Sequence, residues 1–491
     1  MRKPKIYSLL CIFFSSSLFS QHTFSKGLDF DDNSYAIIQK KAKLTRSLEI
    51  IPAAYSLKQF APTPKNQGEY GTCAAWSTAY CGRTILEAIK NGWTEKEKIT
   101  SNAFSPAFLF RLLKPKDTAC MGGSTVSDAF EMMKEKGSLL YKSLPIACTP
   151  YLTPSQMMMA ANSKIKDFLR LFDVSADYKI KIQSVKKSIS EQKPVVFGMI
   201  CPPSFEVAKN VWTPTEDAAK ISGGHAMCVV GYDDNKEGGV FEIQNSWGTD
   251  WGNAGYIWIR YNDFAMFTKY AFEFIDFRET ISEIPDLAVA IKPSLSRSIK
   301  PDLSGSIKLT LADGRDMPAN LLISTRGLSV VPTKIAPGPL TLYRTVEPYL
   351  SGTRFRIYIS NNEPAYVYSF STDLSKEVTK IFPNEEGISA ALTDKKNAVA
   401  IPDEDHYIEF DNKPGKDYLC VLYAKNAMPI NEILKKIKEE QQGTFSEKIF
   451  KVIGKEMVDP KNIKFSPNEI GFSGFSSGKS VVAMLVELEH K

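Results

Sequence analysis

The chain has 491 residues, of which 43% are hydrophobic and 24% charged, the balance of a folded globular protein rather than a disordered one. Its length exceeds what one ordinary hydrophobic core occupies, so two folded domains are expected. The formal net charge is only +6, and no basic helix or aromatic–basic pattern suggests a nucleic-acid surface. Composition therefore indicates a globular protein of two domains with no nucleic-acid partner.

The first residues have the pattern of an export signal. Arg2, Lys3 and Lys5 precede an apolar run, 6–19, that is too short for a comfortable membrane span. The pattern predicts a signal peptide over 1–21 and a secreted or periplasmic mature protein. No other stretch reaches the roughly 18 apolar residues that a spanning helix needs, so we expect no transmembrane segment in the mature protein.

Residues 22–50 form a short, charged N-terminal segment. The extended sequence 51–57 is expected to open a folded domain that runs over 51–278.

A glycine-rich loop, 66–72, ends at Cys73, where a run with helical spacing begins and continues to Asn91-Gly92. A thiol in the first turn of a helix lies at the positive end of the helix dipole, which favours the thiolate. Gln67 lies close enough in sequence for its amide to reach the same place, and a side-chain N–H beside a backbone N–H suits an oxyanion. The alternative is that Cys73 is a small buried hydrophobic residue.

The chain holds four histidines, and His225 opens an apolar strand directly after Gly223 and Gly224. It is the obvious imidazole base if Cys73 has one. A hydrogen-bonded core histidine is the alternative.

A third segment, 240–252, delivers Asn245 at the end of a strand, with Trp247 two residues later and a glycine turn that returns the chain as a second strand. An asparagine carbonyl can hold one imidazole nitrogen so that the other faces a thiol. The alternative is an Asn-Ser turn under aromatic cover.

The motifs Gln-x5-Cys, Gly-His-Ala and Asn-Ser-Trp-Gly, in this order, resemble the papain-like cysteine peptidases over roughly 51–277. The resemblance implies Cys73 as the nucleophile, His225 as the base and Asn245 as its orienting residue. It implies Gln67 as an oxyanion donor and Trp247 as a shield for the His–Asn hydrogen bond. The implied fold class is α+β, with a helical lobe and a β-barrel-like lobe.

The resemblance also implies substrate-binding residues and a covalent link. Gly122 and Gly123 are expected to form one wall of the cleft, since bare glycine lets a peptide backbone approach closely, and Gly224 is expected to border it. Cys120 begins a Cys-x-Gly-Gly turn that is normally bridged in the family, and Cys148 is its expected disulfide partner here. Relatives carry a long inhibitory propeptide, whereas residues 22–50 offer room for only a stub, so autoinhibition of that kind is not expected.

Beyond the first domain the composition and the predicted secondary structure change. Residues 279–302 have the Pro- and Ser-rich composition of a linker. Half-buried antiparallel strands are then predicted at 353–359, 365–370 and 417–423, charged helices at 431–442 and 446–455, and a closing strand at 481–488. Residues 346–425 resemble an uncharacterised domain attached to secreted bacterial enzymes. A separate, mainly-β accessory domain is therefore expected over 303–491.

The sequence thus predicts a secreted, bacterial cysteine peptidase with a Cys-His-Asn triad. The expected partner is a protein or peptide substrate, with a possible cell-surface ligand for the second domain. Neither a phosphate loop nor zinc-type spacing is found, so no cofactor or metal is expected. Two alternatives remain: an amidase or isopeptidase acting on cell-wall peptides, and a catalytically dead papain-like fold used for binding or adhesion.

Overall fold

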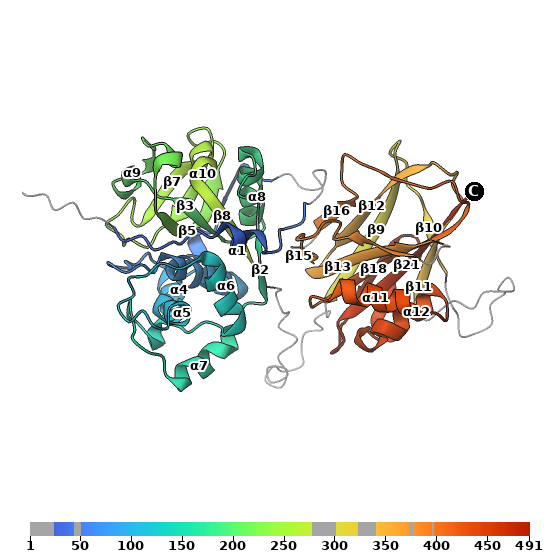
Figure 1. The fold of residues 1–491 in the computed structure, drawn as a ribbon, viewed down its shortest axis with the longest axis horizontal. Coiled ribbons are helices and arrows are strands. Elements are labelled where there is room, and N and C mark those ends of the chain that lie inside the picture. Colours follow the sequence, from blue (N-terminus) through green and yellow to red (C-terminus); the bar gives the residue numbers. More distant parts are fainter. Residues whose placement is uncertain (1–23, 44–50, 277–300, 323–339, 374–376, 395–396) are drawn as a thin grey trace, which may run out of the picture.

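The computed structural model describes residues 24–43, 51–276, 301–322, 340–373, 377–394 and 397–491. In Figure 1 they form two bodies side by side along the long axis of the molecule. The first body has helices on one side and a sheet on the other, and the second is built mainly of strands. The predicted signal peptide and nearly all of the predicted linker lie outside the described residues.

The helix that begins at Cys73 lies between the two lobes of the first domain. It runs without a break through α2 (Cys73–Ala75), a π-helical stretch (Trp76–Arg83) and α3 (Thr84–Lys90), and is capped by Asn91. Every residue from Cys73 to Leu86 is buried. At Gly82 a Cβ atom would lie 2.7 Å from the Phe274 ring, so glycine allows the helix to pack directly on the sheet.

Three other helices of this lobe begin at side-chain caps. Ser105 accepts a hydrogen bond from the Phe108 amide, and Thr125 accepts one from the Asp128 amide. Thr153 and Gln156 form a reciprocal capping box. The elements are α4 (Lys96–Ser101), α5 (Pro106–Leu113), α6 (Val126–Glu135) and α7 (Pro154–Ala160).

The sheet of the first domain has β5 at its centre and brings His225 to the helical lobe. Eight strands of the described residues pair in the order β2-β8-β3-β5-β6-β7-β4, with β1 added beside β5. His225 lies opposite Met199 on β3, and α8 (Tyr178–Ser190) and α10 (Tyr261–Phe267) contact the sheet strands. The strands are β1 (Ala54–Ser56), β2 (Asp167–Arg170), β3 (Val195–Ile200), β4 (Val211–Trp212), β5 (Gly224–Asp233), β6 (Val240–Gln244), β7 (Tyr256–Arg260) and β8 (Thr268–Ile275).

The second domain packs two sheets face to face. In the described residues one sheet follows the order β10-β11-β21-β18-β13-β14 with β15 beside β13, and the other follows β16-β12-β9-β20-β19 with β17 beside β12. The strands are β9 (Leu303–Leu311), β10 (Ala319–Leu322), β11 (Thr341–Thr345), β12 (Arg354–Asn361), β13 (Ala365–Thr372), β14 (Val378–Phe382), β15 (Ala391–Leu392), β16 (Asn397–Ile401), β17 (Ile408–Glu409), β18 (Gly415–Ala424), β19 (Ile463–Phe465), β20 (Ile470–Gly474) and β21 (Val481–His490).

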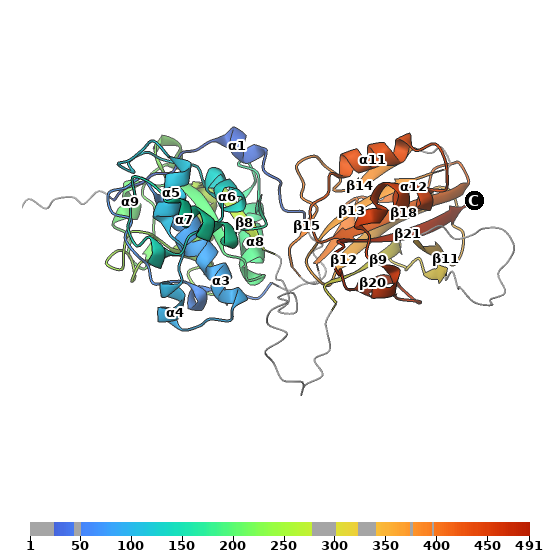
Figure 2. The same ribbon diagram turned by 90° about the horizontal axis from the view of Figure 1, so that it is seen from below.

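The expectation of half-buried strands holds for β12, where buried and partly exposed residues alternate, but is wrong for β13. Seven of the eight β13 residues are buried because α11 (Ile430–Glu439) and α12 (Phe445–Ile453) pack on the outer face of that sheet, as Figure 2 shows. A strand covered on both faces reads as continuous burial rather than alternation.

The N-terminal segment links both domains. Residues 24–30, which we call the strap, run along the first domain, and α1 (Asp32–Ala36) follows. Lys40 then donates its amide to the Gly387 carbonyl and accepts from the Ser389 amide of the second domain, at 2.6 and 2.8 Å. Figure 2 shows the chain running from α1 to the edge of the second domain beside β15.

A buried ion cluster joins the same segment to both domains. The Lys41 ammonium lies 2.6 Å from Glu191 and 2.7 Å from Glu273, two carboxylates that are buried. Glu273 also accepts a hydrogen bond from Thr393 of the second domain at 2.8 Å. The second domain is therefore separate in its sheets but docked on the first.

Candidate active site

Cys73 lies at the start of α2, at the bottom of the space between the lobes. Its side chain is fully buried. The nearby backbone N–H groups of Ala226 and Gly27 lower the pKa of the thiol. His225 precedes Ala226 on β5, the strand that packs against α2.

His225 and Asn245 are joined by a 2.7 Å contact between Nε2 and Oδ1. The imidazole is fully buried, and its Nδ1 atom has no hydrogen-bond partner in the described residues. The indole of Trp247 stacks on the imidazole at 4.5 Å. With Nε2 held by an amide oxygen, Nδ1 is the nitrogen left to accept a proton.

Gln67 is held by a residue that the sequence analysis did not single out. The Ser246 hydroxyl donates to Gln67 Oε1 at 2.6 Å, and the Gln67 backbone N–H donates to the Ser246 carbonyl at 2.8 Å. The Gln67 amide nitrogen therefore points the other way, where it donates to the carbonyls of Tyr70 (2.8 Å) and Ser25 (3.2 Å). Ser246 lies inside the Asn-Ser-Trp-Gly motif, so the signal for it was present.

Although the N-terminal segment is short, its strap covers the site. The Ser25 carbonyl accepts hydrogen bonds from the Gln67 amide and, at 3.2 Å, from the Trp247 indole. Phe24 stacks on Trp247 at 4.7 Å. A Cβ atom at Gly27 would lie 2.1 Å from the Gly71 carbonyl oxygen, so only glycine passes there. About seven residues are enough to span these contacts.

Beyond Gly27 the strap pairs with both lobes as an added strand. Its Leu28 amide donates to the Gly224 carbonyl at 3.3 Å, and Ser124 exchanges hydrogen bonds with the Gly27 carbonyl (2.9 Å) and the Asp29 amide (3.1 Å). Gly224, expected from the sequence to border a substrate, here hydrogen-bonds to the strap. On the helical lobe the strap's backbone partner is Ser124, and not Gly122 or Gly123.

Gly122 and Gly123 have different structural roles. A Cβ atom at Gly123 would meet the Asp29 side chain at 2.3 Å, so this glycine leaves room for the strap. The Gly122 amide instead donates to the Asp117 carboxylate at 2.7 Å and closes the turn.

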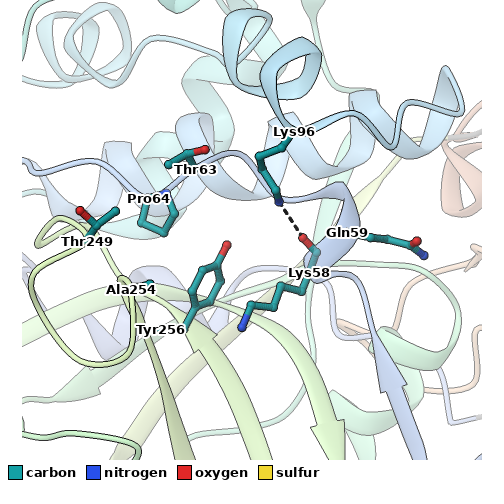
Figure 3. Close-up of a pocket in the computed structure, with 8 residues that line it drawn as sticks. All are labelled: Lys58, Gln59, Thr63, Pro64, Lys96, Thr249, Ala254 and Tyr256. Atoms are coloured by element: carbon teal, nitrogen blue, oxygen red, sulfur yellow. Dashed lines mark hydrogen bonds between the residues drawn. The ribbon is translucent and has the colours of Figure 1, made fainter.

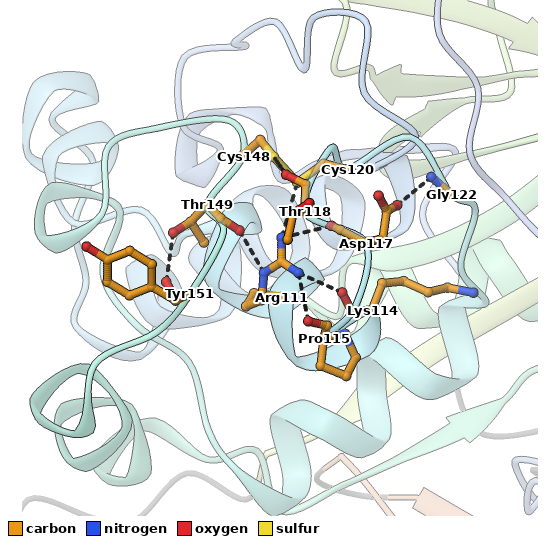
Figure 4. The surroundings of a disulfide bond; sticks show 10 residues. All are labelled: Arg111, Lys114, Pro115, Asp117, Thr118, Cys120, Gly122, Cys148, Thr149 and Tyr151. Atoms are coloured by element: carbon orange, nitrogen blue, oxygen red, sulfur yellow. Dashed lines mark hydrogen bonds between the residues drawn. A yellow bond between two sulfur atoms is a disulfide. The ribbon is translucent and has the colours of Figure 1, made fainter.

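A disulfide joins Cys120 and Cys148 and supports this wall of the cleft. Figure 4 shows Arg111 beside it, with its guanidinium donating to the backbone carbonyls of four surrounding residues: Lys114, Pro115, Asp117 and Thr149. The Cys120 carbonyl in turn accepts from the Gly71 amide at 2.9 Å, two residues before Cys73. The disulfide loop is therefore coupled to the loop that carries the thiol.

Burial under the strap decides the protonation of the two reactive groups. It raises the pKa of the Cys73 thiol to about 11, an effect that backbone hydrogen bonds only partly offset. It lowers the pKa of His225 to about 4, against the opposing effect of the Asn245 hydrogen bond. At neutral pH the covered site therefore holds a neutral thiol and a neutral imidazole rather than an ion pair.

A separate pocket of about 490 Å³ lies elsewhere on the first domain, as Figure 3 shows. Its two lysines are engaged: Lys58 pairs with Glu242 at 2.5 Å, and Lys96 donates to the carbonyl of Lys58. Within the described ranges, no group of three or more histidine, cysteine, aspartate or glutamate side chains is arranged to hold a metal ion. None of the helices described combines the length and apolar character that crossing a membrane requires.

Comparison with known proteins relates the first domain to cysteine proteases. Residues 55–271 match the papain family cysteine protease model, and residues 348–427 match a domain of unknown function, DUF4384. The chain is 25% identical to cysteine proteinase 3 of Entamoeba histolytica over 45% of its own length and 67% of that protein. It is 26% identical to cathepsin K of Mus musculus over 41% of its length and 57% of that protein.

Among solved structures, xylellain, a cysteine protease from Xylella fastidiosa, aligns with 52% of this chain and 96% of its own, at a TM-score of 0.42 and 20% identity. The first domain is that of a cysteine-type peptidase. The papain family match covers most of this domain, and the DUF4384 match follows it in the same chain.

Proposed function

We propose that this protein is an exported cysteine peptidase that the strap keeps latent, and that it hydrolyses peptide bonds of protein substrates once the strap has left the cleft. The observation that carries the proposal is the arrangement at His225. One ring nitrogen is held by Asn245 while the other, buried and without a hydrogen-bond partner, is free to take the proton of the neighbouring thiol.

In the open cleft, His225 Nδ1 accepts the Cys73 proton, and the thiolate attacks the carbonyl carbon of the scissile bond. The oxyanion is stabilised by the Cys73 N–H and the Gln67 amide, which Ser246 already orients. The imidazolium then donates its proton to the leaving amine. Water hydrolyses the thioester, releases the carboxylic acid and restores the thiol.

Latency follows from what the strap occupies. The Ser25 carbonyl takes the hydrogen bond of the Gln67 amide that the proposed mechanism reserves for the substrate oxygen. The Gly27 N–H lies near the sulfur and lowers the pKa of the thiol. No substrate carbonyl can reach either group while these contacts persist. The predicted export signal, the basis for the exported state, stays a prediction from the sequence.

The proposal is tested with a variant in which one added methyl group on the strap favours the open cleft. In Gly27→Ala, the added Cβ clashes with the Gly71 backbone, and overpacking of this kind costs about 1–3 kcal/mol, or roughly 5–150-fold in the closed-to-open ratio. We expect peptide hydrolysis to rise by that factor over the unaltered chain. Adding Cys73→Ala to this variant should reduce hydrolysis by about 10⁴-fold or more.

Ser25→Ala is the matched control, because the described contacts of Ser25 come from its backbone carbonyl, which alanine keeps. Its activity should equal that of the unaltered chain. Hydrolysis that persists in Gly27→Ala/Cys73→Ala would contradict the assignment of Cys73. An unchanged rate in Gly27→Ala would contradict latency.

A further inference from the structure

The side chain of Lys26 lies beside the reacting groups. Its neighbours along the strap are Ser25, whose carbonyl accepts from the Gln67 amide, and Gly27, whose N–H lies near the Cys73 sulfur. Lys26 therefore lies between the residues that approach the proposed oxyanion donor and the proposed nucleophile. Its side chain turns toward the sheet lobe, where it meets the segment between β3 and the end of α9 (Pro203–Glu206).

Two acceptors meet the Lys26 ammonium there. The Glu206 carboxylate lies 2.7 Å away, with side-chain exposures of 23% for the lysine and 16% for the glutamate. The Cys201 carbonyl accepts a second hydrogen bond at 3.1 Å. A carboxylate and a carbonyl converging on one point suit a cationic donor, and a charge-assisted hydrogen bond of this kind is among the stronger polar contacts.

Glu206 is placed by a rigid support. Its own carbonyl accepts from the Trp251 indole at 2.9 Å. The preceding residue, Phe205, is fully buried and lies between 5.1 and 5.9 Å, ring to ring, from three indoles: Trp212, Trp247 and Trp251. Trp247 is the indole that stacks on His225. The carboxylate is thus built onto the same aromatic cluster that shields the proposed base.

We propose that Glu206 is a specificity-determining residue, which selects a basic side chain, lysine foremost, at a position flanking the scissile bond of the substrate. The inference rests on the proposed function and adds a substrate class to it. In the described residues, the Glu206 carboxylate pairs with no cation other than Lys26. When the strap leaves, that carboxylate is left in the groove without a cation.

A substrate with lysine at this position restores both contacts that the strap makes. One with glutamine cannot pair with the charge, and one with glutamate is repelled by it. Discrimination of this kind is strong when a site is built around a charged hydrogen bond, because the wrong side chain leaves the site's own group unpaired. Lys26 lies between Ser25 and Gly27, so its counterpart in a substrate flanks the scissile bond whether the substrate runs in the same direction as the strap or in the opposite one.

The test uses the full chain opened by Gly27→Ala, with Leu28→Asp as a second opening variant because Leu28 is buried against Gly198 and Gly224. Glu206→Gln and Glu206→Lys are added to each. The substrates are peptides that are identical except at the two residues flanking the cleaved bond, which are lysine, glutamine or glutamate. The readout is the ratio of kcat/KM between lysine and glutamate peptides, with the cleaved bond located by mass spectrometry.

We expect the opened chain to favour lysine peptides by at least about tenfold, Glu206→Gln to bring the ratio near one, and Glu206→Lys to reverse it. Asp217→Asn, an equal change of charge at an exposed residue of the following loop, should leave the ratio unchanged. A merely structural role for Glu206 would lower hydrolysis of all the peptides equally, and a ratio that Glu206→Lys does not move overturns the inference alone. Absence of hydrolysis in both opened chains contradicts the proposed function itself.

Discussion

A buried histidine in the cleft of the first domain and two buried tyrosines in the core of the second differ in how their polar atoms are partnered. In the second domain the Tyr423 hydroxyl lies 3.0 and 2.9 Å from the carbonyls of Ser306 and Ser360, and the Tyr343 hydroxyl lies 2.9 Å from those of Ser466 and Gly471. These hydroxyls join strands and are fully used by the fold. In the cleft, His225 Nδ1 has no partner, and the Gln67 amide shares its hydrogen bonds with a segment that can leave.

The hydrogen-bond partners of a buried polar group therefore help to distinguish a role in the fold from a role in the proposed reaction. A buried polar group that is satisfied by its own domain stabilises the fold, and removing it costs stability. The unpartnered His225 Nδ1 and the Gln67 amide under the strap cost stability to keep, and in our proposal they are retained for what they do when uncovered.

The largest expected effect on stability is at the ion cluster that joins the two regions. Lys41→Met leaves Glu191 and Glu273 buried without their shared cation, which should cost about 3–5 kcal/mol in the free energy of unfolding. Urea denaturation measures it. Lys40→Met is the matched control: its partner Asp173 is 47% exposed, so a change below about 1 kcal/mol is expected. Equal losses in the two variants would contradict a special role for the cluster.

Gln67→Ala is expected to break activity while sparing the fold. In the Gly27→Ala chain it should lower kcat by about 10²–10³-fold, because one oxyanion donor is lost. The fold should survive with a moderate loss of stability, because the hydrogen bonds of Gln67 to Ser246 and Tyr70 are lost. A large loss of stability with an unchanged kcat would place Gln67 with the architectural residues instead.

The pH dependence of strap release follows from His225. Burial lowers its pKa to about 4 in the covered cleft, and uncovering the ring should raise the pKa toward the ordinary value of 6.5, so the open state binds more protons between these values. The closed state is therefore stable above pH 6.5 and is weakened by up to about tenfold per pH unit as the pH falls toward 4. Hydrogen exchange at the amides of Leu28 and Asp29, corrected for intrinsic rates, measures this. Protection that is constant between pH 7 and 4 would contradict it.

The smallest expected effect is that of a substitution in the core of the second domain. Tyr423→Phe removes a hydroxyl that bridges two strands and should cost about 1–2 kcal/mol of stability. Hydrolysis by the opened chain should not change, because the residue lies in the second domain. A change in kcat/KM would show that the two domains are coupled in catalysis.

Much of the fold was predictable because local signals act on their own. Ser105 before Pro106, Thr153 with Gln156, and Gly92 after the long helix each set a helix end by chemistry contained within a few residues. The Cys, His and Asn motifs likewise each carry their own glycine or aromatic context. Their family pattern identified the domain, and the structure brings His225 and Asn245 into contact.

The strap and Glu206 could not be predicted in the same way. Whether residues 24–30 enter the groove depends on pairing with Ser124 and Gly224, which are about 100 and 200 residues away in sequence. Glu206 gains its meaning only from Lys26, 180 residues earlier. The π-helical stretch, and the packing of α11 and α12 on the outer face of β13, are also decided by tertiary packing rather than by local propensity.

One measurement tests the central claim most directly: the rate at which a thiol-directed epoxide labels the full chain, with the labelled residue identified by mass spectrometry, in the unaltered protein and in Gly27→Ala. The account predicts slow labelling of the unaltered chain, faster labelling of Gly27→Ala by the factor seen in hydrolysis, and the label on Cys73 in both. Equal rates in the two proteins, or a label on Cys201 or another cysteine, would contradict it.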